Sequence, residues 1–137
     1  MPNRLLLASL SVSLALAASL ASAQGASLDG RAFVADAGIA GKPAEENNEV
    51  ITFKQGRFHS SACDKYGFTT GEYRAMPASG GVAFETETMS PSDGRIVWKG
   101  TIRDDEIEGT FVHHPKGWLF NPDPAPVEHW FKGKTKG

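Results

Sequence analysis

The sequence is poor in cysteine, in charge of one sign and in long apolar runs. It contains one cysteine among 137 residues, so no disulfide within the chain can stabilise the fold. Basic and acidic residues are nearly balanced, 14 against 16, and are mixed along the chain, which argues against a nucleic-acid partner. After the first 23 residues, no apolar stretch approaches the roughly 20 residues of a membrane helix. We therefore expect no transmembrane segment in the mature chain.

The long apolar run at the start of the chain is typical of an export signal. Arg4 gives a positive start, residues 5–20 are apolar apart from serines, and Ala21-Ser22-Ala23 fits the small-x-small pattern that signal peptidase cleaves. This pattern predicts a mature chain that begins near Gln24 and is periplasmic or secreted. Removing 23 of the 137 residues leaves 114, enough for one small domain and too few for two. We expect a single small β-barrel domain over residues 24–137.

The mature sequence shows strands and turns, without a convincing helical period. Residues 50–54 and 57–60 are two β-rich runs separated by two residues, the second of which is glycine. Glycine supplies the positive φ that a tight hairpin turn needs. In this hairpin Phe53 lies opposite Phe58, on the face that the alternation predicts to be buried.

A second hairpin, over residues 95–113, is clearer still. Its turn consists of two aspartates, and the resulting register places Trp98 opposite Phe111 on the buried face. The same register places Gly100 opposite Gly109, which leaves no side chains at that level. Facing glycines suit a sharply bent strand pair or the close approach of another group.

Weaker alternation and turn residues predict four further strands, over residues 28–36, 72–76, 82–88 and 127–132. The polar segment 37–48 is predicted to be a long mobile loop. About eight short antiparallel strands in consecutive hairpins form an up-and-down meander. Because closure removes exposed strand edges, we predict an all-β, small closed barrel, with a two-sheet β-sandwich as the alternative. Strands this short predict a barrel that is mostly filled.

Two stretches of the sequence also carry a resemblance to a known group. The segments Trp98–Ile102 and Ile107–Phe111 resemble the W-x-G-t-i…i-x-G-t hairpin of small lipocalin-like (calycin-like) bacterial secreted or periplasmic proteins. Residues 53–63, followed by Tyr66-Gly67-Phe68, look like the first half of the same group. The resemblance spans roughly residues 28–133. It implies a barrel with a ligand site at one end, and it implies no catalytic residue.

Aromatic side chains form the first candidate site. An apolar cluster leads into the proline-rich loop 118–126, which could be a lid or a partner-binding surface. Alternatively, its aromatic side chains could close one barrel end. We expect this loop, together with the second hairpin beneath it, to form a site for a small apolar ligand or an envelope protein. The predicted ligand-binding residues are Trp98, Phe111, Trp118 and Phe120.

Histidine and cysteine form the second candidate site. Thiolate and imidazole bind soft and borderline metals, and such a site needs three or four convergent ligands. The candidate ligands are His59, Cys63, His113 and His129. The strand pattern brings only His113 and His129 together, with Cys63 as a third member, and ordinary rim hydrogen bonds are the alternative. Cys63 could also be a small buried residue, carry a thiol cap or link two chains through a disulfide.

Three functions remain open at this point. The first is a non-enzymatic exported binding module, the second a metal- or thiol-dependent site, and the third a purely structural or inhibitory envelope protein. No phosphate-binding glycine loop and no zinc-finger spacing is present, and no catalytic residue or cofactor is predicted.

Overall fold

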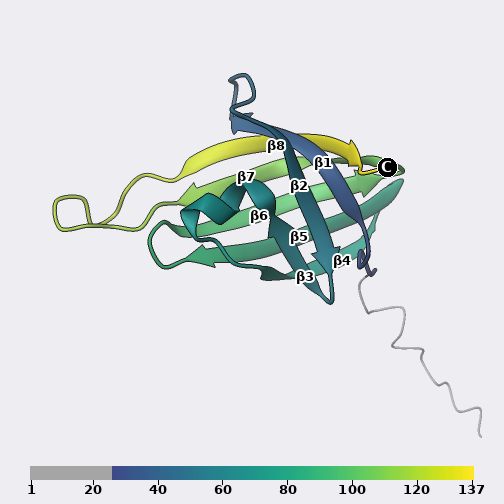
Figure 1. Ribbon diagram of the computed structural model, residues 1–137, viewed down its shortest axis with the longest axis horizontal. Helices are drawn as coiled ribbons and strands as arrows, with labels where there is room; N and C mark the ends of the chain where they lie inside the picture. The colour runs from purple at the N-terminus through teal and green to yellow at the C-terminus, as the bar shows by residue number, and fades with distance from the viewer. Residues whose placement is uncertain (1–25) are drawn as a thin grey trace, which may run out of the picture.

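The computed structural model describes residues 26–137, so the predicted export signal over residues 1–23 lies outside the described residues. Its strands are β1 (Ala32–Ile39), β2 (Glu46–Lys54), β3 (Arg57–Ser60), β4 (Gly71–Ala78), β5 (Gly81–Ser90), β6 (Gly94–Arg103), β7 (Glu106–His114) and β8 (Val127–Thr135). They form an antiparallel meander that closes into a barrel, because β1 pairs with both β2 and β8 (Figure 1). The predicted up-and-down closed barrel is confirmed, and the sandwich alternative is wrong.

Both predicted hairpins have the expected register. Phe53 lies opposite Phe58 between β2 and β3, and Trp98 lies opposite Phe111 between β6 and β7. The β2–β3 turn has positive φ at both central residues, of which the second is Gly56. This conformation matches the right-handed twist of the flanking strands, so the local sequence is sufficient to fix the turn.

The prediction of a long loop over residues 37–48 is wrong. β1 continues to Ile39 and β2 begins at Glu46, so the connection is short. The cause is pairing with a distant part of the chain, because β8 pairs with β1 as far as Ile39, which lies opposite His129. A sequence pattern read along one segment does not contain that pairing.

One short helix was also not predicted. Residues Ser61–Tyr66 form a 3-10 helix, η2, between β3 and β4. Gly67 follows it in the left-handed conformation, a common way to end a helix. In the described part of the chain, no helix has the length and apolarity needed to cross a bilayer.

Aromatic side chains fill much of the barrel interior. Those that are almost fully buried are Phe33, Phe53, Phe58, Trp98 and Phe131. The facing glycines of β6 and β7 make room for them, because a Cβ at Gly100 or at Gly109 would come within 2.8 Å or 2.7 Å of Cζ of Phe131. Of the two alternatives predicted at these glycines, a sharply bent strand pair or the close approach of another group, the structure shows the close approach.

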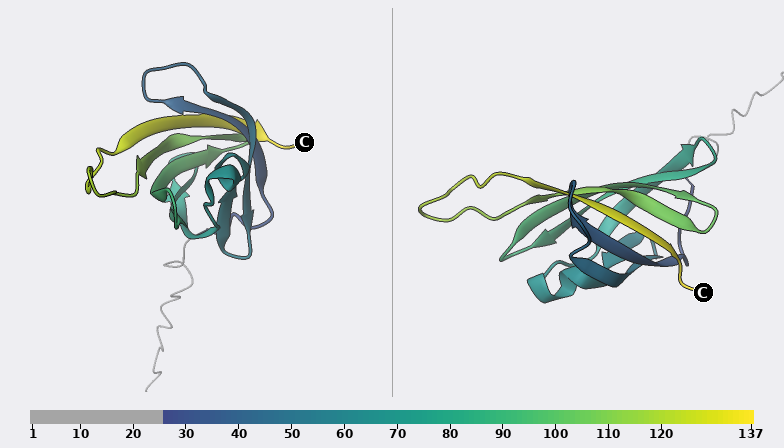
Figure 2. Two further views of the ribbon diagram at one scale, coloured as in Figure 1. Left: turned by 60° about the vertical axis from the view of Figure 1, so that its left-hand side comes forward. Right: turned by 90° about the horizontal axis from the view of Figure 1, so that it is seen from above.

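The connection between β7 and β8 is a long loop that extends away from the barrel (Figure 2). Trp118 and Asn121 exchange two backbone hydrogen bonds of 2.9 Å, which close the tip of the loop into a tight turn. The side chains of Trp118, Leu119 and Phe120 at this tip are 60%, 85% and 80% exposed. They therefore do not close the barrel end.

Candidate functional site

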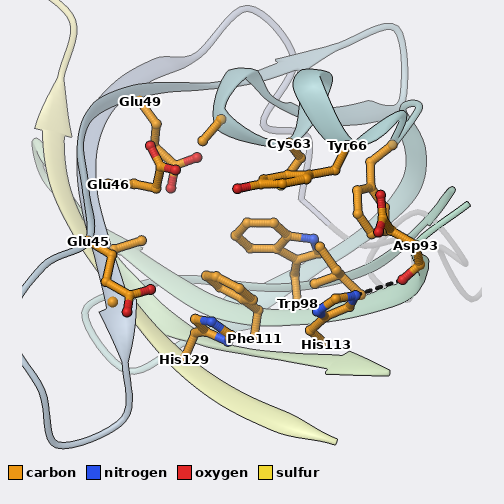
Figure 3. A pocket seen from close by; sticks show the side chains of 15 residues that line it. Glu45, Glu46, Glu49, Cys63, Tyr66, Asp93, Trp98, Phe111, His113 and His129 are labelled. Carbon is orange, nitrogen blue, oxygen red and sulfur yellow. Dashed lines mark hydrogen bonds between the residues drawn. The ribbon is translucent and has the colours of Figure 1, made fainter. Parts of the chain in front are cut away.

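A cavity of about 320 Å³ lies at one end of the barrel. Its walls come from the end of β1, the start of β2, η2, the start of β6, the end of β7 and the start of β8. This volume is at the lower end of the range for pockets that hold small molecules. The cavity is thus large enough for one small ligand. Figure 3 shows the side chains that line it.

Aromatic rings form one wall of the cavity. The rings of Trp98 and Phe111 lie 4.2 Å apart between centroids, and the ring of His129 stacks on Phe111 at 4.5 Å with an angle of 6° between planes. The indole N–H of Trp98 donates to Oγ1 of Thr88 over 3.2 Å, which fixes the ring. Of the four residues predicted to bind a ligand, Trp98 and Phe111 line this cavity, whereas Trp118 and Phe120 lie at the exposed loop tip.

The charged side chains that line the cavity are all acidic, and sequence reasoning missed them. They are Glu45, Glu46, Glu49 and Asp93. Figure 3 shows the three glutamates on one side of the cavity, with Glu46 and Glu49 close together and Glu45 nearer His129. Lys65 of η2 neutralises one of them, because its Nζ donates to Oε1 of Glu46 over 2.9 Å. The other three carboxylates have no basic partner among the ion pairs of the described residues.

Glu49 is the most buried of these carboxylates. Its exposed fraction is 5%, and the hydroxyl of Ser60 donates to its Oε2. Burial raises the pKa of Glu49, and the negative charges of Glu46 and Asp36 raise it further, while hydrogen bonds from Ser60 and the backbone of Ala62 lower it. The site therefore contains a carboxyl group held in an unfavourable environment for its charge.

A signal for Glu49 was present in the sequence. Glu49, Ile51 and Phe53 occupy alternate positions of β2 and are all buried. Extending the alternation of the predicted strand by one residue toward the N-terminus would have placed Glu49 on the inner face. The residue was missed because it fell between the predicted loop, which ended at residue 48, and the predicted strand, which began at residue 50.

The structure brings three of the four candidate metal ligands to the cavity. Cys63, His113 and His129 line it, whereas His59 pairs outside with Asp64, its Nε2 lying 2.6 Å from Oδ1. Nε2 of His113 donates to the backbone oxygen of Asp93 over 2.7 Å, so this nitrogen is already occupied. Across residues 26–137, no three His, Cys, Asp or Glu side chains converge closely enough to hold a metal ion.

The protonation of His129 and Cys63 is set mainly by burial. Burial lowers the pKa of His129, and the nearby His113 lowers it further against the opposing effects of Val127 and Glu45. Burial raises the pKa of the Cys63 thiol to about 11, with smaller contributions from the charges of neighbouring carboxylates. A thiol with this pKa remains protonated near neutral pH, where it is a poor nucleophile and a poor metal ligand.

Comparison of the chain with protein-family models, with curated proteins and with solved structures found no match. The cavity and the exposed loop tip are the features of the described residues that bear on function.

Proposed function

We propose that the protein is an exported, non-enzymatic binding module that holds a small, largely apolar ligand in the cavity at one end of its barrel. The observation that carries this proposal is the cavity of about 320 Å³ with Trp98 and Phe111 in its wall. Large aromatic surfaces supply most of the binding energy in sites of this kind, and a few polar groups orient the ligand. The export signal predicted over residues 1–23 and the resemblance to lipocalin-like bacterial proteins support the periplasm as its location.

A cavity-filling variant tests this proposal. Ala62 lines the cavity from η2, so Ala62→Phe reduces its volume, whereas Thr110→Phe adds the same ring on the exposed face of β7. The probe is the apolar dye N-phenyl-1-naphthylamine, whose fluorescence rises in apolar surroundings. We expect binding by the wild type and by Thr110→Phe, and weak or no binding by Ala62→Phe. Equal binding by both variants, or none by the wild type, would contradict the proposal.

The exposed loop tip favours a second candidate function, the docking of an envelope protein. The tip carries a contiguous apolar surface made of Trp118, Leu119 and Phe120. Two backbone hydrogen bonds between Trp118 and Asn121 close the turn that holds them. Exposed aromatic side chains of this kind are typical of interaction sites, because Trp in particular contributes strongly to interfaces.

Site-specific photo-crosslinking in cells tests this second function. A photoreactive amino acid at Leu119 should give a defined protein adduct, and the same amino acid at Glu108, which is exposed on β7, should not. The same adducts from both positions would indicate nonspecific contact, and no adduct from Leu119 would contradict docking at this tip.

A further inference from the structure

The charge of the cavity bears on the class of ligand that the cavity can hold. The described residues place four carboxylates in its walls and no lysine or arginine. Lys65 lies outside and compensates only Glu46. Because charges in a partly enclosed site are weakly screened, the remaining carboxylates favour a positively charged molecule over a neutral or negative one.

Among the residues of the cavity, Glu49 most strongly favours a positively charged ligand. Buried charged groups in proteins are normally paired with an opposite charge. Glu49 has a hydroxyl partner, Ser60, and the nearby charged groups Glu46 and Asp36 have the same sign as its own carboxylate. The folded chain therefore leaves this carboxylate without a counter-charge among the described residues, and a ligand ammonium group in the cavity would supply one.

The aromatic wall favours the same class of molecule. The faces of aromatic rings attract cations, and Trp does so most strongly. The indole N–H of Trp98 is already bonded to Thr88, so it is not available to a ligand anion. His129 adds no positive charge near neutral pH, because burial lowers its pKa. The side of the cavity that carries the carboxylates and the side that carries the aromatic rings therefore both disfavour an anionic ligand.

We propose that the cavity binds a small organic amine in its ammonium form, with the charged group toward Glu49 and an apolar or aromatic part against Trp98 and Phe111. This proposal rests on the proposed function, since it names the class of ligand that the same cavity would hold. The cavity volume limits the molecule to a small one, such as a single ring with a short aminoalkyl chain.

Three probes of nearly equal size test the charge preference. They are 2-phenylethylamine, 2-phenylethanol and phenylacetate, which are positive, neutral and negative at pH 7. Binding is followed by calorimetry and by the NMR signal of the Trp98 indole N–H, which reports on the cavity wall. We expect the amine to bind about tenfold more tightly than the alcohol and phenylacetate to bind most weakly.

Carboxylate variants locate the effect. Glu49→Gln keeps an acceptor for Ser60 and should weaken amine binding about tenfold while it leaves binding of the alcohol unchanged. Glu45→Gln is a second variant that tests for weaker amine binding. It removes the charge of an exposed carboxylate of the cavity and does not disturb the core. Glu108→Gln, on the exposed face of β7, is the matched control and should change nothing.

The outcomes separate this inference from the proposed function. Equal or tighter binding of the alcohol or of phenylacetate, with a shift of the Trp98 signal, would overturn the amine proposal and leave the binding module intact. If the amine leaves the Trp98 signal unchanged, the amine proposal is also overturned, and the naphthylamine assay then decides whether the cavity binds ligands at all.

Discussion

At the residue scale, Glu49 combines burial with a negative charge. Its pKa is raised above the ordinary value of 4.5, so between that value and the raised one the folded chain holds more protons than the unfolded chain. The free energy of unfolding therefore falls as the pH rises through this window.

We predict that Glu49→Gln removes this fall. The free energy of unfolding of the variant, relative to the wild type, should increase as the pH rises from below 4.5 toward neutrality. Urea unfolding at a series of pH values measures this difference, and the control is Glu108→Gln, which changes an exposed carboxylate. A difference that does not change with pH would show that Glu49 titrates as it does in the unfolded chain.

Cys63 gives a second prediction at the residue scale. Because its pKa rises from 9.0 to about 11, the folded protein contains roughly 100-fold less thiolate at pH 8 than the unfolded chain. A thiolate of higher pKa is also more nucleophilic, which offsets part of this difference, so alkylation by iodoacetamide, followed by mass spectrometry, should be slower by about tenfold in buffer than in urea. The same slow reaction disfavours a disulfide-linked dimer through Cys63, and equal alkylation rates would contradict a thiol whose pKa is raised by partial burial.

At the element scale, the sequence predicts what is local. The two hairpins were predicted with their registers because a turn and its flanking alternation lie within a few residues, as for Phe53 opposite Phe58. The end of β1 was not predicted correctly, because it depends on the pairing of Ile39 with His129, which lies 90 positions further along the chain. Glu49 was missed for a different, local reason: it lies one residue before the predicted strand over residues 50–54, so the alternation that places it on the inner face was not extended to it.

The facing glycines give a prediction for one element. A Cβ at Gly109 would lie 2.1 Å from the backbone oxygen of Lys99 and 2.7 Å from Cζ of Phe131, and neither can move without disturbing the barrel. We expect Gly109→Ala to lower the free energy of unfolding by about 1–3 kcal/mol, the usual cost of overpacking. Urea unfolding measures this loss.

The matched control for this prediction is Thr110→Ala, one residue further along β7 on its exposed face. That variant should stay within about 0.5 kcal/mol of the wild type, as is usual for surface substitutions. If the two variants were equally stable, the close packing of Phe131 against the glycines would be wrong.

At the scale of the whole molecule, the cavity and the exposed loop lie at the same end of the barrel. His113 near the end of β7 and His129 near the start of β8 line the cavity, and the loop that joins these strands projects beyond it (Figure 1). The floor of the cavity is continuous with the aromatic core, whereas the loop tip contacts neither. The cavity and the loop tip are therefore structurally separate.

This separation predicts that the two candidate functions can be removed one at a time. Replacing Trp118, Leu119 and Phe120 together with serine should leave the thermal stability and the affinity for 2-phenylethylamine unchanged, because these side chains are exposed and do not line the cavity. The same variant, with the photoreactive amino acid placed at Asn121, should lose the protein adduct that this position gives in the wild-type loop. If the triple variant instead loses affinity for the amine, the loop closes over the cavity when ligand is bound, and the two functions share one site.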